Sequence, residues 1–217
     1  MEPATHPCPL CGASAPVVFT VGIQPFYDCP ECGLLHRDPA YHLGPEAERA
    51  HYEQHDNSPE DREYLNFLSR LWTPLSEKLS RGMSGLDYGS GPGPAMHMLA
   101  EADGMHLECY DPYFAPRIHN LNTQWDFITC SETAEHFREP DKEFLFLSRL
   151  LKPGAWLGVM TSLIDHADGP LEKWHYLTEP THNVFYRRAC FEWMAGGEAF
   201  NRPEFPARNI VLMQKPA

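Results

Sequence analysis

The stretch Leu86-Asp87-Tyr88-Gly89-Ser90-Gly91-Pro92-Gly93-Pro94 decides the fold that we expect for this chain. It has the pattern of a buried strand that ends in a glycine-rich loop, with a helix following from about Ala95 to Ala102. Glycines at three alternating positions let the backbone turn sharply and let a ligand lie directly against it. The loop therefore predicts a small-molecule site at the end of a strand.

The spacing of the glycines narrows the choice of ligand. A dinucleotide fingerprint would need glycine at Pro94, and no Gly-Lys-Ser/Thr of a phosphate loop follows. A Gly-x-Gly-x-Gly loop behind the acidic Asp87 resembles motif I of class I S-adenosylmethionine (SAM) methyltransferases. An acidic loop also suits a ligand with an ammonium and a sulfonium better than it suits phosphates. The alternative is a glycine-rich turn without a ligand.

A second acidic residue supports this resemblance. His106 to Asp111 predicts a strand that ends in a carboxylate, which is placed to accept hydrogen bonds from both ribose hydroxyls of a nucleoside. The resemblance implies a doubly wound, Rossmann-like α/β sheet. It also implies that the cofactor contacts come from Asp87, Tyr88, Gly89, Ser90, Gly91, Gly93, Asp111, Pro112, Ser131, Glu132 and Tyr64.

The chain departs from the family pattern after Asp111. The next clear strand, 125–130, follows too soon for the usual helix, strand and helix, and Pro112 and Pro116 disfavour a long helix between them. We expect one edge strand and its helix to be trimmed or missing, which affects the usual adenine contacts. The residues that could replace these contacts are Asn122, Gln124 and Trp125.

Two further segments carry the resemblance. Residues 126–137 resemble motif IV of the superfamily, and 150–161 resemble the turn and fifth strand behind it. The spacing Glu132-x-x-Glu135-His136 is similar to that of ubiquinone-pathway O-methyltransferases, where it is associated with a divalent metal. The resemblance implies a hydroxyl acceptor, assisted by Mg²⁺ or by His136 and Glu135 as catalytic groups. The alternative is that His136 only orients the loop.

A polar and aromatic stretch follows, from Ser162 to Tyr186. A long connection after the carboxyl end of a strand is placed to cover an acceptor site. The pieces at 174–176 and 181–186 resemble the corresponding segment of small-molecule methyltransferases of this branch. His175 and His182 are therefore candidates for proton removal, although either could merely hold the loop. A helix near 189–195 and a hairpin ending at Met213 predict an antiparallel sheet edge.

Four of the seven cysteines form two Cys-Pro-x-Cys-Gly knuckles. Two tight turns of this kind offer four thiolates to one tetrahedral zinc ion, and the apolar segments 17–19 and 25–27 between them predict the strands of a zinc ribbon. Four thiolates close the coordination shell, so we expect a structural zinc rather than a catalytic one. We expect His36 in a solvated loop, with replacement of a cysteine in a variant zinc shell as its alternative, and Cys109, Cys130 and Cys190 as buried small residues. The predicted zinc ligands are Cys8, Cys11, Cys29 and Cys32.

Residues 45–81 have a helical pattern. Ser58 and Pro59 give a good helix start, and apolar residues from Tyr64 to Trp72 recur at helical spacing. This helix is expected to pack on the main domain. Its alternative or additional role is to close over the cofactor, with Tyr52, His55, Asn57 and Tyr64 as candidates.

The composition restricts the partners. The chain has 217 residues, with 17 Lys and Arg against 30 Asp and Glu, and its formal net charge of −13 disfavours binding to nucleic-acid phosphates or anionic lipid. The first residues lack the pattern of a signal peptide, and no apolar run approaches the ~18 residues of a membrane span. We therefore expect a cytoplasmic protein.

Taken together, the motifs predict a SAM-dependent methyltransferase of a small-molecule acceptor. We expect a zinc ribbon over 1–44, a helical lid or linker over 45–81 and the methyltransferase domain over 82–217. The zinc ribbon could also dock a protein partner. Two alternatives are an RNA methyltransferase that grips its substrate with the ribbon, and a SAM-binding or scaffold protein without turnover.

Overall fold

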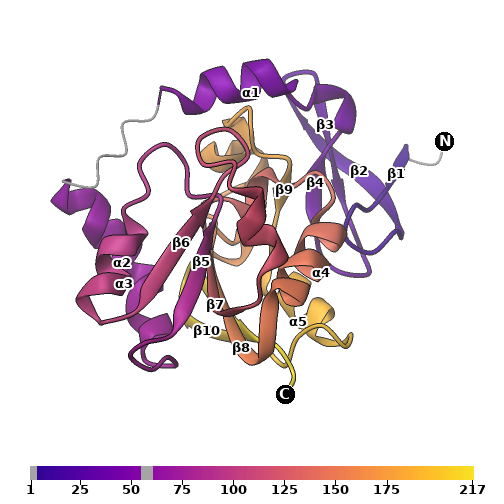
Figure 1. Cartoon of the computed structure of the whole chain (residues 1–217). Helices are drawn as coiled ribbons and strands as arrows, with labels where there is room; N and C mark the ends of the chain where they lie inside the picture. Colours follow the sequence, from indigo (N-terminus) through magenta and orange to yellow (C-terminus); the bar gives the residue numbers. More distant parts are fainter. Residues whose placement is uncertain (1–3, 55–60) are drawn as a thin grey trace.

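The computed structural model describes residues 4–54 and 61–217, and Figure 1 shows a central sheet between helices with a second sheet beside it. The central sheet has six strands in the order β10-β11-β8-β7-β5-β6. Its strands are β5 (Ser84–Tyr88), β6 (His106–Tyr110), β7 (Trp125–Ser131), β8 (Leu151–Met160), β10 (Glu204–Ala207) and β11 (Ile210–Gln214).

Hydrogen bonding makes the middle of this sheet parallel and one edge antiparallel. β5 pairs in parallel with β6 and β7, β7 pairs in parallel with β8, and β11 runs antiparallel to β8. β10 and β11 form the expected final hairpin. The carboxyl ends of β5, β6 and β7 consequently meet at one edge of the sheet, where ligands of open α/β sheets bind.

Helices cover both faces of the sheet. α2 (Arg62–Ser76) and α3 (Met96–Ala102) bury their apolar sides with Phe127, whereas α4 (Pro140–Leu150) and α5 (Arg188–Ala195) share a core with Ile128. Successive residues of β7 point to opposite faces, so both sides of this strand are buried and its sequence is almost continuously apolar. The predicted doubly wound α/β fold is confirmed.

The predicted loss of an edge strand is also confirmed within the described residues. Between β6 and β7 the structure has only a bridge from Asp111 to Ala115 and a 3₁₀ turn, Ile118–Asn122, so that β6 forms the sheet edge. The remaining 3₁₀ turns are Pro39–Tyr41, Ala134–His136, Ile164–His166, Leu171–Lys173 and His175–Thr178.

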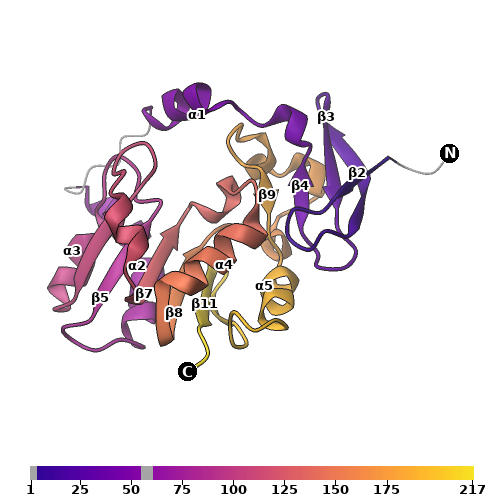
Figure 2. The ribbon, with the colours of Figure 1, turned by 45° about the vertical axis from the view of Figure 1, so that its right-hand side comes forward.

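The N-terminal sheet contains one strand from the far end of the chain. Its order is β1-β2-β3-β4-β9, and Figure 2 shows it standing beside α4 and α5. In β9, Phe185 pairs with Leu35 and Val184 pairs with His36 of β4. The five strands are β1 (Thr5–Pro7), β2 (Ser14–Val21), β3 (Gln24–Asp28), β4 (Leu35–Arg37) and β9 (Val184–Phe185).

Side chains bind this sheet to the rest of the molecule. Arg187 donates from both terminal nitrogens to the Asp28 carboxylate, at 2.8 and 2.7 Å, and also donates to the Gly33 carbonyl. Cys29, Tyr186 and Phe191 lie in one buried cluster. The division at residues 44 and 81 stays a prediction. β9, from the predicted methyltransferase domain, is a strand of the N-terminal sheet, and residues of both sheets share one buried cluster.

The segment between the sheets differs from its expected boundaries. α1 (Pro45–Tyr52) is the first helix, and α2 begins at Arg62, where the Asp61 side chain accepts from the Glu63 amide at 2.8 Å. The N-cap of α2 is therefore Asp61, and not Ser58 at the expected helix start. The residues Ser58, Pro59, His55 and Asn57 lie outside the described part of the chain.

Two other expectations concern buried residues and membranes. His36 is not in a solvated loop: it lies on β4, is 1% exposed and stacks on Tyr27. Cys109, Cys130 and Cys190 are buried as predicted.

No helix in residues 4–54 or 61–217 is both long and apolar enough to cross a bilayer.

Candidate functional site

A cavity of about 780 Å³ lies at the carboxyl ends of β5, β6 and β7. Glu48 of α1, Tyr64 of α2 and the loop at 175–182 also line it, so that its lining comes from segments between residues 48 and 182. Figure 1 shows α1 crossing this end of the sheet. The cavity therefore combines a pre-formed sheet edge with a cover of α1 and one loop.

The glycine loop forms one wall of this cavity. Gly89 has φ +79°, and a Cβ atom there would lie 2.2 Å from the Thr133 side chain. Glycine is required at this position because an L side chain would be both strained and in collision. The amides of Gly89 and Ser90 donate to the Tyr110 carbonyl at 2.8 and 3.2 Å, which fixes the loop against β6.

Asp111 organises the neighbouring loop. One carboxylate oxygen accepts from the Gly91 amide at 3.0 Å, and the other accepts from the Tyr113 and Phe114 amides at 2.8 and 3.0 Å. The side chain lines the cavity and is 7% exposed. Carboxylate oxygens can accept further hydrogen bonds, so Asp111 can hold the glycine loop and contact a ligand as well.

Asp87 lies beneath the loop rather than in the cavity wall. It is 5% exposed and accepts a hydrogen bond of 2.7 Å from the Thr129 hydroxyl. Burial raises the pKa of this carboxyl to about 6, although the Thr129 hydroxyl lowers it. Asp87 and Gly93 are absent from the described lining, so both act on the cavity through the loop that they support.

The residues expected to replace the adenine contacts do not reach the cavity. Asn122 donates to the Ile118 carbonyl of its own 3₁₀ turn, and Gln124 donates to the Arg149 carbonyl. Trp125 is buried, and its indole nitrogen donates to the Asn120 carbonyl. The expectation for all three was wrong. The side chains of Asn122 and Gln124 bond to backbone carbonyls outside the cavity lining, and the strand 125–131 turns Trp125 into the core. Tyr88 and Tyr110 line the cavity instead, as a stacked pair with ring centroids 5.4 Å apart.

Two carboxylates mark the end of β7. Glu132 has φ +46°, which is uncommon for a residue other than glycine, and it lines the cavity. Burial, and then the charge of Glu135, raises the pKa of Glu132 well above its usual value. Glu135 is 0% exposed and accepts a hydrogen bond from the Tyr176 hydroxyl. The cavity lining therefore carries two neighbouring carboxyl groups at this point, and Glu135 is shielded from solvent.

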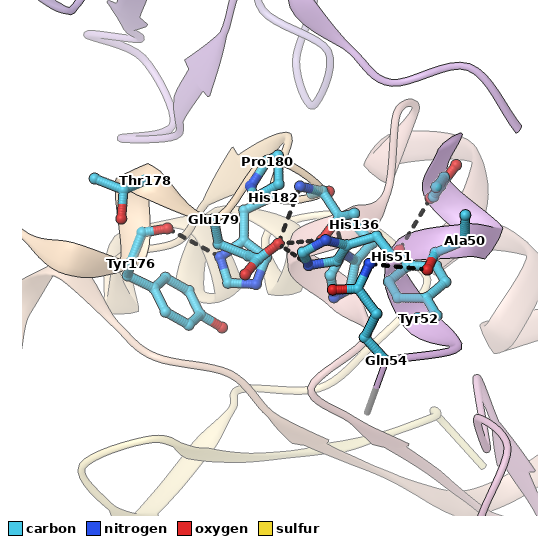
Figure 3. Close-up of polar contacts among 12 residues, drawn as sticks. Ala50, His51, Tyr52, Gln54, His136, Tyr176, Thr178, Glu179, Pro180 and His182 are labelled. Carbon is cyan, nitrogen blue, oxygen red and sulfur yellow. Dashed lines mark hydrogen bonds and ion pairs between the residues drawn. The ribbon is translucent and has the colours of Figure 1, made fainter. Parts of the chain in front are cut away.

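Two imidazoles adjoin these carboxylates. His136 and His182 have ring centroids 4.9 Å apart, and each Nδ1 lies 3.0 Å from a backbone carbonyl, of Thr181 and Tyr176 respectively. Burial, and then neighbouring His136, lowers the pKa of His182 to about 2. His182 is therefore a neutral imidazole at physiological pH. Figure 3 shows both rings between Tyr176 and α1.

A sequence profile of a family described as "Methyltransferase domain" matches residues 54–201, about two thirds of the chain. The chain belongs to this methyltransferase family. No curated protein matches it by sequence.

Solved methyltransferases share the fold of this family member. Two similar chains are phosphoethanolamine N-methyltransferase 2 from Haemonchus contortus, one in complex with S-adenosyl-L-methionine and one with phosphomonomethylethanolamine and S-adenosylhomocysteine. Both have a TM-score of 0.57, at 14% and 15% identity. The matches cover 78% and 80% of this chain but 57% and 58% of those chains, so the present chain spans little more than half of their length.

Most residues predicted for the site meet in the cavity of this methyltransferase domain. Their assignment to cofactor or acceptor stays a prediction. Those that line the cavity are Tyr64, Tyr88, Gly89, Ser90, Gly91, Asp111, Pro112, Ser131, Glu132, Glu135, His136, His175 and His182. His175 is exposed, in contrast to the buried His182.

The methyltransferase cavity also contains residues that we did not predict. Glu48 of α1 accepts from the hydroxyls of Tyr52 and Tyr113 at 3.0 and 3.1 Å, and from Arg138 at 3.0 Å. Glu48 thereby connects α1 to the loop after Asp111 and to Arg138, in the turn after His136. Nothing in the local sequence distinguishes Glu48 from the other charged residues of a solvated helix.

The loop that covers the methyltransferase cavity is held by the N-terminal sheet. Arg37 of β4 is 2% exposed and donates hydrogen bonds of 2.8 Å to three backbone carbonyls of this loop, those of Leu177, Glu179 and Pro180. The Asn183 side chain donates to the His136 carbonyl at 2.8 Å. The N-terminal sheet therefore holds the loop that carries Tyr176 and His182, a contact that the sequence pattern does not indicate.

The four knuckle cysteines converge as predicted. Their sulfur atoms all lie within 4.8 Å of one another, with Sγ separations of 3.5 Å for Cys8 and Cys32 and of 3.4 Å for Cys11 and Cys29. A tetrahedral zinc with bonds of about 2.3 Å separates its sulfur ligands by roughly 3.8 Å. The geometry fits such an ion, and an all-thiolate donor set suits zinc.

Proposed function

We propose that this chain transfers a methyl group from SAM to the hydroxyl oxygen of a small-molecule acceptor. The observation that carries the proposal is a single cavity in which the glycine loop and Asp111 face the cluster of Glu135, His136 and His182. One side of the cavity suits the cofactor, and the other side suits an acceptor that must lose a proton.

The cofactor side supports SAM through shape and charge. Gly89 and Gly91 let a ligand approach the backbone, and Asp111 is placed to accept hydrogen bonds from ribose hydroxyls. Among the described residues, the hydroxyls of Ser90 and Ser131 are buried without a hydrogen-bond partner, so both are available to a ligand. The stacked Tyr88 and Tyr110 offer an aromatic surface for adenine.

The acceptor side supports proton removal by an imidazole. A methyl transfer needs an in-line approach of the oxygen to the sulfonium methyl, so positioning and exclusion of water supply most of the rate. A neutral imidazole can accept the hydroxyl proton as the oxygen attacks. We assign this role to His182 or His136, with Glu135 beside them, and His175 is a more exposed third candidate.

The charge of the lining favours neutral or cationic acceptors. Among the described residues no lysine or arginine lines the cavity, whereas six carboxylates do, from Glu48, Asp111, Glu132, Glu135, Glu143 and Glu179. Glu48 is paired with Arg138, and the raised pKa of Glu132 favours its neutral form, but the other lining carboxylates have no lysine or arginine beside them in the lining. A phosphorylated or carboxylated acceptor would therefore meet net negative charge here. The same argument, with the formal net charge of −13, disfavours RNA as the substrate.

The remaining assignments extend this proposal. We assign a structural zinc ion to Cys8, Cys11, Cys29 and Cys32, where it would stabilise the sheet that positions the cavity loop. Mg²⁺ at Glu132, Glu135 and His136 stays a prediction, as do a protein partner at the ribbon and a cytoplasmic location.

Calorimetry with SAM tests the central claim. Zinc-replete chain should bind SAM with micromolar affinity, and Asp111→Ala should abolish binding because the loop loses its anchor and the ribose its acceptor. Asp168→Ala, which changes an exposed aspartate far along the chain, should bind as the unchanged protein does. If neither SAM nor S-adenosylhomocysteine binds the unchanged chain, the proposal is wrong. If SAM binds, transfer of its labelled methyl group to hydroxylated compounds identifies the acceptor class.

A further inference from the structure

Glu135, His136 and His182 come together although 46 residues separate the last two in the sequence. One ligand atom from each lies within 4.8 Å of the others, and all three residues line the cavity. We propose that these three side chains bind one divalent transition-metal ion at the acceptor side of the cavity. This site is separate from the four N-terminal cysteines. The proposal rests on the proposed methyl transfer and replaces one part of it: with the lone pairs of His136 and His182 on the ion, His175 is the lining imidazole that remains to accept the acceptor proton.

The backbone contacts of the two imidazoles prepare them to bind a metal. Nδ1 of His136 lies 3.0 Å from the Thr181 carbonyl, and Nδ1 of His182 lies 3.0 Å from the Tyr176 carbonyl. Because a carbonyl only accepts, the ring nitrogen that faces it must carry a proton, so Nε2 is the nitrogen of each ring that can bind a metal. Histidines that ligate metals commonly have this arrangement, with the other ring nitrogen donating to a carbonyl or carboxylate.

Glu135 supplies the second, independent observation. Its side chain is 0% exposed, one oxygen accepts from the Tyr176 hydroxyl, and the other has no hydrogen-bond partner among the described residues. A buried carboxylate oxygen without a partner is costly, and no described lysine or arginine lines this cavity to compensate it. A bound cation would satisfy this oxygen and two imidazole lone pairs at once.

The donor set selects the class of ion. Two imidazoles and one carboxylate suit Zn²⁺, Fe²⁺, Co²⁺ or Mn²⁺, whereas Mg²⁺ prefers oxygen ligands and keeps most of its water. Zinc bonds of about 2.0–2.1 Å would bring the ligand atoms to roughly 3.4 Å from one another, so the widest gap must close by at most about 1.5 Å. Three protein ligands also leave a coordination position open toward the cavity.

Contacts with Asn183 and Tyr52 fix the position of this cluster. Asn183 donates from its backbone amide to the Glu135 carbonyl and from its side chain to the His136 carbonyl, both at 2.8 Å. The ring of Tyr52 packs edge-on against His136, with centroids 5.3 Å apart. Figure 3 shows His182 and His136 next to one another, beside the α1 residues. Ligands held in this way lose little further freedom when they bind an ion.

A cobalt titration tests the proposal without any acceptor. Zinc is first loaded on the cysteines of the full chain, and Co²⁺ is then added while the visible spectrum is recorded. We expect one further equivalent to bind with weak d–d bands and without thiolate charge-transfer bands. Proton NMR of this complex should show two shifted exchangeable signals, from the Nδ1 protons of His136 and His182. His182→Gln and Glu135→Gln should weaken binding about tenfold or more.

One variant of the same cavity serves as the control for cobalt binding. His175→Gln removes an exposed imidazole that also lines the cavity and should leave cobalt affinity unchanged. Equal loss in His175→Gln, unchanged affinity in His182→Gln, or no cobalt beyond the thiolate site would each overturn the proposal. In the last case, an ammonium group of the acceptor would be the cation that satisfies Glu135. SAM calorimetry on the cobalt-free chain separates this outcome from a failure of the proposed methyl transfer.

Discussion

Replacing Arg37 with methionine should lower the free energy of unfolding by about 3 kcal/mol and loosen the loop that covers the cavity. The guanidinium donates three hydrogen bonds of 2.8 Å to the carbonyls of Leu177, Glu179 and Pro180. Each buried carbonyl that loses its donor costs roughly 1 kcal/mol, at the lower end of the range because a loop can admit water. Methionine keeps the unbranched stem, so the loss of packing is small.

Two measurements follow from this reasoning. Urea unfolding of zinc-loaded protein gives the change in stability, and hydrogen exchange locates it. Amide protection should fall in residues 174–185, which carry Tyr176 and His182, while the glycine loop and Asp111 keep their protection. SAM binding should change less than about threefold, because no predicted cofactor contact bonds to Arg37.

The matched control is Arg49→Met. Arg49 forms an exposed ion pair with Glu53 within α1, at 2.9 Å, and such pairs contribute about 0.3–0.5 kcal/mol. If Arg37→Met lost no more stability than this control, or if exchange rose uniformly instead of in the loop, the assigned role of Arg37 would be refuted.

Three other perturbations test separate parts of the structure. Gly89→Ala should cost about 1–2 kcal/mol for its positive φ and about 1–3 kcal/mol more for the collision with Thr133, and should abolish SAM binding in calorimetry. Removal of zinc with a chelator should expose the amides of residues 4–37 and 176–186 to exchange, because β4 pairs with β9. Lowering the pH from about 7.5 to 5.5 should cost about 1.3 kcal/mol through His36, whose pKa burial lowers to about 4, and His36→Gln should remove this part of the loss. The sign follows because a histidine with a lowered native pKa stabilises the fold above pH 6.5 and loses that contribution as the pH falls.

Each of these has a control in the same chain. Gly91 has a similar φ of +64° but open space around a Cβ atom, so Gly91→Ala should show the strain without the collision. This control applies to the free energy of unfolding alone, because Gly91 also lines the cavity. Cys109→Ser alters a buried cysteine outside the ribbon and should retain zinc. His119→Gln changes an exposed histidine and should keep the original pH slope, measured by urea unfolding in excess zinc. Equal effects in variant and control would contradict the corresponding prediction.

The sequence by itself determined the features that depend on local spacing. The glycine loop, the strand ending at Asp111, the two cysteine knuckles and the missing edge strand could all be predicted, because each depends on backbone constraints within a few residues. The periodicity of apolar residues likewise predicted α2, although its N-cap was assigned three residues too early.

Only the tertiary structure decided which distant residues meet. The pairing of β9 with β4, the contact of Arg37 with the loop at 177–180, and the meeting of His182 with His136 join segments separated by 45 residues or more. No local pattern encodes these contacts, because they arise where two sheets and a covering loop pack together. The tertiary structure likewise placed Trp125 in the core and brought Tyr110, which no motif indicates, beside the predicted Tyr88 in the cavity lining.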